Sequence, residues 1–521
     1  MLIFEWLIVL TSLTYLTSSR LDQAKFGRFR GYILLATIAA ILGHFLFESA
    51  RWQLVPLYLA VSGIALARIR KSQFTFWLRF AGYFLSAILL ILGISLGNVF
   101  PIKTIPAPSG PYAVGTFNSE LIDDSRIERY EPEFNRGVSV QVWYPVDAGI
   151  GLDGYYKQTL FHELYSGDND LISFLTGYLR NVETNSHVNA PIAMHEPFPL
   201  VIFNHGLYIM VDQSIQLMEH LASNGYIVAS ISHPFESLKV TLSDRGSRTY
   251  SMRYPEDVGF SNNDIDDGGI GDKIGTFSGK QHSELLQELY ALFDSYSDAP
   301  TEEEKARIIE EALSFESLQV LQPLLTKDYL TDFVKWRSLV RNRSTTYWVE
   351  DIQFTVDEIP NIETVVTNFN DALDISALGV VGFSYGGSAT GEFCKVDARC
   401  KAGINLDGTQ FGPNWNKPTI APFLLINSDT NPRGNDYAYY PAPRNFHDIH
   451  IPRTEHPDYI DALTVFPILR LLGLSGEMGY QELADLVGDL SLSFLDENLK
   501  MRAGKFQEQL NASGDSVVRL N

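Results

Sequence analysis

The segment Gly382–Gly387, with the sequence Gly-Phe-Ser-Tyr-Gly-Gly, contains the residue best suited to nucleophilic chemistry. Ser384 follows the apolar run Leu378–Val381 and precedes residues that are compatible with a helix. This order of strand, turn and helix is the context of a nucleophile elbow, in which small residues permit a tight turn. The helix amino terminus then stabilises developing negative charge. A serine flanked by glycines can also be a surface turn, and the preceding strand is what favours a catalytic role for Ser384.

A second candidate segment lies upstream, where the strand-like run Leu200–Asn204 is followed by His205-Gly206-Leu207. In hydrolases with a nucleophile elbow, the loop at this place donates one backbone N–H to the oxyanion hole, and the residue after the nucleophile donates another. We therefore predict that Leu207 and Tyr385 are the two donors. We expect His205 to fix the loop rather than to transfer protons.

A serine nucleophile needs a base and an acid, which in this architecture follow it in the order Ser, Asp, His. Asp407 and Asp429 each follow a strand-like run, and either carboxylate could orient a histidine. Three histidines lie further along the chain, namely His447, His450 and His456. The local pattern does not choose between the two acids or among the three bases.

The same histidines could instead bind a metal together with Asp448. Because a serine mechanism needs no metal, we predict neither a metal nor an organic cofactor. The chain has two cysteines, which excludes a disulfide-rich scaffold and a multi-cysteine zinc or iron–sulfur site. Outside the cytoplasm Cys394 and Cys400 could form a small disulfide, and the alternative is a pair of unpaired buried thiols.

The elements that would position these residues alternate between strands and helices. Several strand-like segments are continuous apolar runs, as expected when helices cover both faces of a sheet. Helical patterns such as Ser214–Ser223 and Ile362–Leu373 lie between them. The alternation predicts an α/β fold with a mostly parallel, doubly wound sheet. The predicted strands are Val138–Tyr144, Leu200–Asn204, Tyr226–Ser232, Gly379–Phe383, Ala402–Leu406, Phe423–Asn427 and Asn445–Ile451.

Residues 238–350 interrupt this alternation, and we interpret them as a helical insertion over the sheet. The Asp- and Gly-rich segment Asn262–Gly271 predicts a loop. Lys280–Tyr296 and Thr301–Glu316 predict helices, the second of which opens with three glutamates that favour a helix amino terminus.

Charge divides the chain of 521 residues into two parts. The formal net charge is −22, but residues 1–100 hold nine Lys or Arg against three Asp or Glu, so their net charge is +6 and that of residues 101–521 is −28. Hydrophobic residues make up 45% and charged residues 20%, which excludes global disorder. The chain lacks a concentrated basic face, so we expect no nucleic acid partner.

Residues 1–100 contain four apolar runs and predict a transmembrane domain of about four helices. The basic residues gather in loops 17–30 and 68–79, which the positive-inside rule places in the cytoplasm. The acidic body 101–521 would then lie on the periplasmic or extracellular side of an integral membrane protein, most simply of a bacterial inner membrane. Buried helices of a soluble core are the alternative. The four runs are Leu2–Leu16, Gly31–Phe47, Leu54–Ala67 and Phe80–Val99.

Taken together, motifs spread over residues 110–461 resemble the type II platelet-activating factor acetylhydrolases, secreted and intracellular, and their bacterial relatives among the α/β-hydrolases. The resemblance places the acid at Asp407, with Asp429 as the alternative. Family members show His-x-x-Phe-x-Asp around the base, and His456-Pro457-Asp458-Tyr459-Ile460-Asp461 fits this pattern with Tyr for Phe, whereas His447 and His450 do not. The other segments that carry the resemblance are Gly110–Gly115, Arg136–Pro145, His205–Leu207, Gly225–Ala229, Ser384, Leu406–Gly408 and Asn427–Ser428.

The resemblance implies an α/β-hydrolase domain and a membrane-anchored serine hydrolase that cleaves carboxylic esters through a Ser384–His456–Asp407 triad and an acyl-enzyme. The substrates it implies are esters, including phospholipids with a short or oxidised acyl chain. An acyltransferase that uses the same triad is one alternative. A non-catalytic membrane receptor or scaffold that retains the hydrolase fold is another.

Overall fold

The computed structural model divides the chain into two compact units. Unit 1 consists of Met1–Ile105 with two later segments, Asp168–Thr184 and Ala462–Gly473, and the remaining residues form unit 2. The predicted loop Asn262–Gly271 lies outside the described residues. The structure describes residues 2–520 except 19–22, 49, 70–74, 167–169, 252–287, 290, 293–294, 297–298, 316–317, 319–325, 336–340, 415–416, 430–438 and 440–444.

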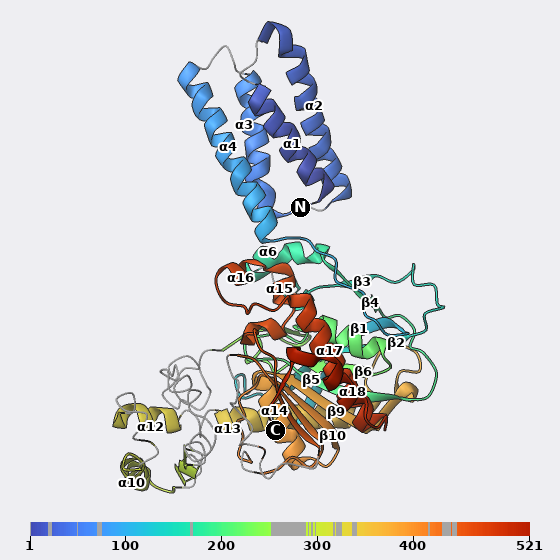
Figure 1. Cartoon of the computed structure of the whole chain (residues 1–521), viewed down its shortest axis with the longest axis vertical. Helices are drawn as coiled ribbons and strands as arrows, with labels where there is room; N and C mark the ends of the chain where they lie inside the picture. Colours follow the sequence, from blue (N-terminus) through green and yellow to red (C-terminus); the bar gives the residue numbers. More distant parts are fainter. Residues whose placement is uncertain are drawn as a thin grey trace. The chain divides into compact units, whose positions relative to one another are not determined.

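Each of the four apolar runs in unit 1 forms a helix, drawn in blue in Figure 1. The stretches Gly27–Phe47 and Phe80–Val99 are long and apolar enough to cross a membrane, whereas the first and third helices are shorter apolar helices. Large apolar side chains on these helices are exposed, among them Tyr32, Leu35 and Phe84. The helices are α1 (Ile3–Ser18), α2 (Gln23–Phe47), α3 (Val55–Ile69) and α4 (Phe76–Val99).

A buried pair of charged groups lies near one end of the bundle. Arg51, between α2 and α3, donates from Nε and Nη2 to the Glu5 carboxylate at 2.9 and 2.8 Å. Buried charges of this kind require such partners. At the same end the Trp52 indole N–H donates to the backbone oxygen of Leu175 at 2.9 Å. The later segments of unit 1 contain α6 (Leu171–Thr176), η2 (Gly177–Asn181), α15 (Ala462–Val465) and α16 (Ile468–Leu471).

Unit 2 is built on a mixed, mostly parallel sheet, in which the described residues form eleven strands in the order β13-β12-β11-β10-β9-β5-β6-β2-β1-β4-β3. The neighbours from β6 through β5, β9, β10 and β11 to β12 are all parallel. The seven predicted strands are all present. Their bounds are β1 (Ala113–Ile127), β2 (Asn135–Val146), β3 (Lys157–Thr159), β4 (Glu183–Val188), β5 (Phe198–Asn204), β6 (Ile227–Ile231), β9 (Leu373–Phe383), β10 (Cys400–Leu406), β11 (Phe423–Asn427), β12 (Phe446–His450) and β13 (Val518–Arg519).

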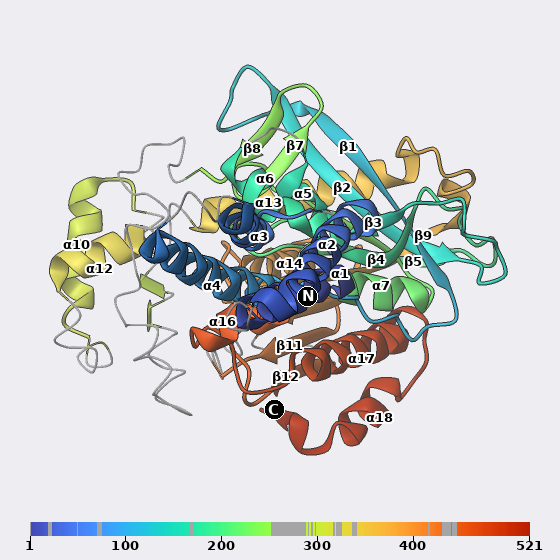
Figure 2. The ribbon, with the colours of Figure 1, turned by 90° about the horizontal axis from the view of Figure 1, so that it is seen from above.

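Helices cover both faces of this sheet, which is why β5 and β11 are buried along their whole length. On one face α7 (Ile215–Ser223) and α17 (Tyr480–Leu499) lie side by side (Figure 2). On the other, α14 (Tyr385–Val396) packs on β5, β9 and β10, and α13 (Asn342–Glu358) packs on α14. Other helices that the structure describes in unit 2 are α5 (His162–Tyr165), α10 (Glu302–Ala312), α12 (Lys327–Lys335) and α18 (Lys505–Ala512).

The predicted helix over Ile362–Leu373 is wrong. The structure has irregular chain and the short 3-10 turn η5 (Asn370–Ala372) there, and β9 begins at Leu373. Ile362, Val366 and Phe369 are spaced like one face of a helix, and all three are buried, but a loop buries them. Asn368 adopts a left-handed backbone with φ of 62°, which a continuous right-handed helix does not allow.

The insertion begins with a two-stranded hairpin, β7 (Lys239–Leu242) and β8 (Gly246–Thr249). The predicted helix over Thr301–Glu316 is α10, whose amino terminus is capped by the Thr301 side chain accepting from the Glu304 N–H. The predicted helix over Lys280–Tyr296 lies partly outside the described residues. The last helix, α13, continues past residue 350 and buries Trp348 and Ile352 in the core.

Candidate active site

The carboxyl ends of neighbouring parallel strands bring the main site residues together. Ser384 follows β9, Asp407 follows β10 and His456 lies in the loop after β12. Leu207 lies in the loop after β5, which pairs with β9. Since parallel strands end at the same edge of a sheet, one edge collects the four predicted residues.

The backbone at Ser384 has the strained geometry of an elbow, with φ of 54° and ψ of −122°. Its N–H donates to the Leu406 oxygen on the neighbouring strand at 2.9 Å. A Cβ on Gly382 would lie 2.1 Å from the Gly386 oxygen, so only glycine fits there. The turn therefore holds a half-buried serine side chain at the start of α14.

Ser384, His456 and Asp407 form a continuous line of hydrogen bonds. His456 Nδ1 lies 2.6 Å from Asp407 Oδ2, and His456 Nε2 lies 2.9 Å from Ser384 Oγ. A carboxylate can only accept, so Nδ1 carries the proton and Nε2 accepts from the serine hydroxyl. The imidazole also stacks on the Phe383 ring at 4.7 Å between centroids. This arrangement can remove the proton from Ser384.

The buried Asp407 carboxylate is held in place by the residue that follows the next strand. Ser428 N–H donates to Oδ1 at 2.7 Å, and Ser428 Oγ–H donates to Oδ2 at 2.8 Å. These bonds balance the charge of a carboxylate that is only 2% exposed. The carboxylate therefore presents Oδ2 to His456 in one fixed orientation.

The alternative acid and bases lie in other environments. Asp429 pairs with His450, with 2.7 Å between Oδ1 and Nε2, and also accepts from the Arg453 N–H. His447 packs against the rings of Phe494 and Phe506. Within the part of the chain that the structure describes, no group of three or more His, Cys, Asp or Glu side chains is placed to hold a metal ion.

The predicted oxyanion donors flank the nucleophile. Tyr385 is the first residue of α14, so its N–H has no acceptor within the helix. A Cβ on Gly206 would lie 3.3 Å from Ser384 Cβ and 2.9 Å from the Phe383 ring, so the loop after β5 passes directly beside the serine. Leu207 follows at once. Both predicted donors thus belong to segments that lie beside Ser384.

The His205 side chain forms hydrogen bonds with this loop and with its neighbours. Its Nδ1 donates to the Gly206 oxygen at 2.7 Å, and its Nε2 accepts from Ser237 Oγ at 2.8 Å and from the His233 N–H at 3.1 Å. Burial, reinforced by the nearby His233, lowers the pKa of His205 to about 3. The ring is therefore neutral near pH 7, and its three hydrogen bonds join the loop to His233 and Ser237.

His233 in turn joins a buried ionic cluster. Its Nδ1 lies 2.9 Å from Asp351 Oδ2, and the Arg136 guanidinium donates to both Asp351 oxygens at 3.1 and 2.6 Å. The Arg136 guanidinium and the His233 imidazole keep the pKa of Asp351 well below its usual range, despite burial that acts to raise it. The His233 ring stacks on Trp348 at 3.6 Å between centroids.

The side chain of Tyr385 connects the elbow to the end of the insertion. Its hydroxyl donates to the Arg341 oxygen at 2.8 Å and lies 3.0 Å from Thr345 Oγ1. Its ring meets Trp348 edge to face at 4.9 Å. Arg341 immediately precedes α13, which also provides Thr345 and Trp348, so this helix buttresses the residue that follows the nucleophile.

Cys394, near the end of α14, and Cys400, at the start of β10, form a disulfide. The bridge closes the turn between the helix that follows Ser384 and the strand that leads to Asp407.

The sequence interpretation missed the residues that orient the predicted ones. In the sequence Ser428 enters through the resemblance only, and no pattern points to a supporting role for Ser237 or His233. Ser428 could have been found, because it stands at the carboxyl end of a strand next to that of Asp407. The others lie in loops and turns whose spacing carries no sign of their contacts.

Comparison with known proteins shows which sequences this chain is similar to. The sequence model of the family "Platelet-activating factor acetylhydrolase, isoform II" matches residues 98–254. Platelet-activating factor acetylhydrolase of Cavia porcellus is 24% identical over 420 residues, which cover 77% of this chain and 79% of that protein. The enzyme of the same name from Canis lupus familiaris is also 24% identical, over 76% of this chain and 78% of its own length.

Among solved structures, a ferulic acid esterase from Streptomyces cinnamoneus superposes with a TM-score of 0.53 at 18% identity, covering 81% of this chain and 100% of that one. At this identity the match concerns the fold, and it agrees with an α/β-hydrolase architecture. The resemblance that the motifs predicted is confirmed, because a model of this family and several proteins named platelet-activating factor acetylhydrolase match the chain.

Proposed function

We propose that the chain is a membrane-anchored serine hydrolase that cleaves carboxylic esters, with phospholipids bearing a short or oxidised acyl chain as its substrate class. The observation that carries the proposal is the hydrogen-bonded line from Ser384 through His456 to Asp407. The acetylhydrolase names of its relatives and the esterase fold support the reaction class.

The proposed reaction proceeds in two halves. His456 Nε2 takes the hydroxyl proton of Ser384 while Oγ attacks the ester carbonyl carbon, and the Asp407 carboxylate stabilises the imidazolium. The N–H groups of Leu207 and Tyr385 donate to the oxyanion, each lowering the barrier by about 3 kcal/mol. The intermediate then collapses, and the alcohol leaves with the proton that His456 held.

In the second half, water replaces the alcohol in the site. His456 takes a proton from the water as its oxygen attacks the acyl carbon, and the second tetrahedral intermediate uses the same two N–H donors. The bond to Ser384 Oγ breaks, Oγ recovers the proton from His456, and the carboxylic acid leaves. No cofactor enters this cycle.

The anchor is the second part of the proposal. Two apolar stretches of spanning length, two shorter apolar helices and exposed apolar side chains support insertion of α1–α4 into a bilayer. The basic loops favour a body outside the cytoplasm. An anchor would hold a domain of net charge −28 close to a lipid surface, from which anionic headgroups would otherwise repel it.

The test uses the full chain in detergent micelles with Ser384→Ala. We expect Ser384→Ala to lower hydrolysis of a nitrophenyl acetate ester, and of a phospholipid with a short second acyl chain, by at least about a thousandfold with an unchanged melting temperature. Ser376→Ala, an exposed serine near the start of the same strand β9, is the matched control and should keep full activity. Full turnover in Ser384→Ala would overturn the proposed mechanism.

A further inference from the structure

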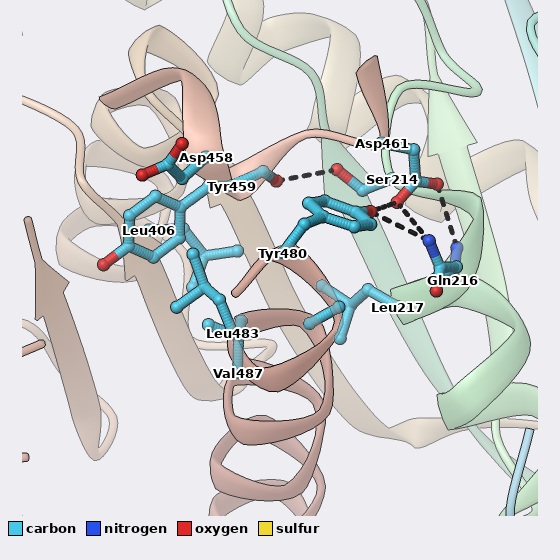
Figure 3. A pocket seen from close by; sticks show the side chains of 11 residues that line it. Ser214, Gln216, Leu217, Leu406, Asp458, Tyr459, Asp461, Tyr480, Leu483 and Val487 are labelled. Carbon is cyan, nitrogen blue, oxygen red and sulfur yellow. Dashed lines mark hydrogen bonds between the residues drawn. The ribbon is translucent and has the colours of Figure 1, made fainter. Parts of the chain in front are cut away.

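The loop that carries His456 is anchored at its far end by Asp461. The Asp461 carboxylate accepts from the Tyr480 hydroxyl at 2.5 Å, from the Gln216 N–H at 3.1 Å and from Gln216 Nε2 at 3.3 Å. Its own N–H donates to the Gln213 oxygen at 2.8 Å. Figure 3 shows Tyr480 and Gln216 converging on this carboxylate from two different helices, α17 and α7.

The residues that receive Asp461 also hold the oxyanion loop. Gln213 Oε1 accepts the N–H of Gly206, next to the predicted donor Leu207, at 2.8 Å. Ser214 Oγ donates to the Tyr459 oxygen at 3.3 Å, within the base loop itself (Figure 3). The turn 213–216 therefore contacts both the loop that carries the base and the loop that carries an oxyanion donor.

Other contacts hold the front of the base loop, where the Gly476 N–H donates to Asp458 Oδ2 at 2.9 Å and the Phe383 ring stacks on His456 and Tyr459. The loop contains the 3-10 turn η7 (His456–Tyr459). At the start of this turn the Asp458 carboxylate accepts a hydrogen bond from the Glu455 N–H at 2.8 Å. Beside this turn lies a small cavity of about 30 Å³, partly open to solvent, lined by Leu406, Tyr459 and Leu483 among others. The hydrogen bonds at the rear of the turn add to these contacts and tie it to the segment 213–216.

We infer that Asp461 is a positioning residue: by joining the base loop to the turn 213–216, it keeps His456 in register with both Ser384 and the N–H of Leu207. This inference rests on the proposed function. If Asp461 had a purely structural role, it would only join α17 to α7. Replacing it would then lower the stability of the protein without changing the rate of the chemical step.

Substitution of two tyrosines distinguishes the positioning role of Asp461 from a purely structural role. Tyr480→Phe removes the phenol that bonds Asp461 and leaves Asp461 itself in place. Tyr226→Phe removes a similar buried phenol, which donates to Asp496 Oδ1 at 2.8 Å. Asp496 lies near the other end of the same helix α17, and Tyr226 precedes β6 at the amino ends of the parallel strands, the edge opposite Ser384. The two variants lose comparable bonds at opposite edges of the sheet.

The experiment compares both variants and Asp461→Asn with the parent in the full chain, measuring kcat and KM for a nitrophenyl ester, the rate of labelling by a fluorophosphonate, and the melting temperature. We expect Tyr480→Phe to lower kcat and the labelling rate together by about tenfold or more, with KM within about twofold, because small misplacements of reacting groups reduce rates by up to about a hundredfold. Tyr226→Phe should lower the melting temperature similarly and keep the parent kcat.

Two results would overturn parts of this account separately. If Tyr480→Phe and Asp461→Asn lose stability but keep the parent kcat while Ser384→Ala is inactive, the positioning role is wrong and the proposed function stands. If Ser384→Ala is active, the proposed function fails and the positioning role fails with it.

Discussion

The substitution Asp407→Asn tests the acid specifically, because the contacts of Asp407 determine the orientation of the asparagine amide that replaces it. Oδ1 receives the Ser428 N–H, a fixed donor, so the asparagine carbonyl oxygen must occupy that position. The amide NH₂ then replaces Oδ2, 2.6 Å from His456 Nδ1. Ser428 Oγ can rotate to accept from it, so nothing opposes this orientation.

The consequence is the wrong tautomer of the base. An NH₂ group facing Nδ1 requires that nitrogen to accept, which moves the imidazole proton to Nε2, and Nε2 then cannot accept from Ser384. A triad with this defect loses about four powers of ten in kcat, or roughly 5 kcal/mol of transition-state stabilisation. Folding should be little affected, since the side chain keeps its shape and hydrogen bonds.

The assay is steady-state hydrolysis of a soluble nitrophenyl ester by the full chain, together with its thermal unfolding. Asp429→Asn is the matched control, because that carboxylate is partly exposed and pairs with His450 rather than with the base; it should keep kcat within about twofold. An Asp407→Asn variant with parental kcat, or a large loss confined to Asp429→Asn, would refute the assignment of the acid.

Two further predictions concern stability. Burial and nearby Glu219 help to raise the pKa of Asp461 to about 6, so as pH rises from 4 to 6 the unfolded chain releases this proton first and the free energy of unfolding falls. The variant Asp461→Asn has no such proton to release. The free energy of unfolding of the variant minus that of the parent should therefore be larger at pH 7 than at pH 4, by up to about 3 kcal/mol, when both are measured by urea unfolding. A difference that is the same at both pH values would contradict this prediction. Replacing Cys394 and Cys400 with Ala should reduce the free energy of unfolding by about 2 kcal/mol, as expected for a short closed loop, and intact mass after alkylation should show no free thiol in the parent.

Much of the fold was predictable because the parallel strands are continuous apolar runs that end in polar residues with catalytic potential. Ser384, Asp407 and His456 each stand directly after such a run or in the loop beyond it, so strand order alone brings them to one edge. The spacing within the chain could not choose His456 over His450. Which histidine reaches Ser384 depends on which loop turns back over the sheet. Only the family motif around His456 distinguishes the two histidines in the sequence.

The features that could not be predicted from the sequence depend on tertiary contacts. The run of residues Ile362, Val366 and Phe369 has helical spacing but is buried as a loop, because one apolar face satisfies either structure. The bonds of Gln213 and Asp461 join segments about 250 residues apart along the chain, and no local pattern encodes them.

The most direct test of the central claim is to label the full chain with a fluorophosphonate and map the modified peptide by mass spectrometry while following residual hydrolysis. The account predicts one adduct per chain, on Ser384, with activity falling in proportion to labelling. Hydrolysis that persists after Ser384 is fully modified, or an adduct on a different residue that abolishes activity, would contradict it.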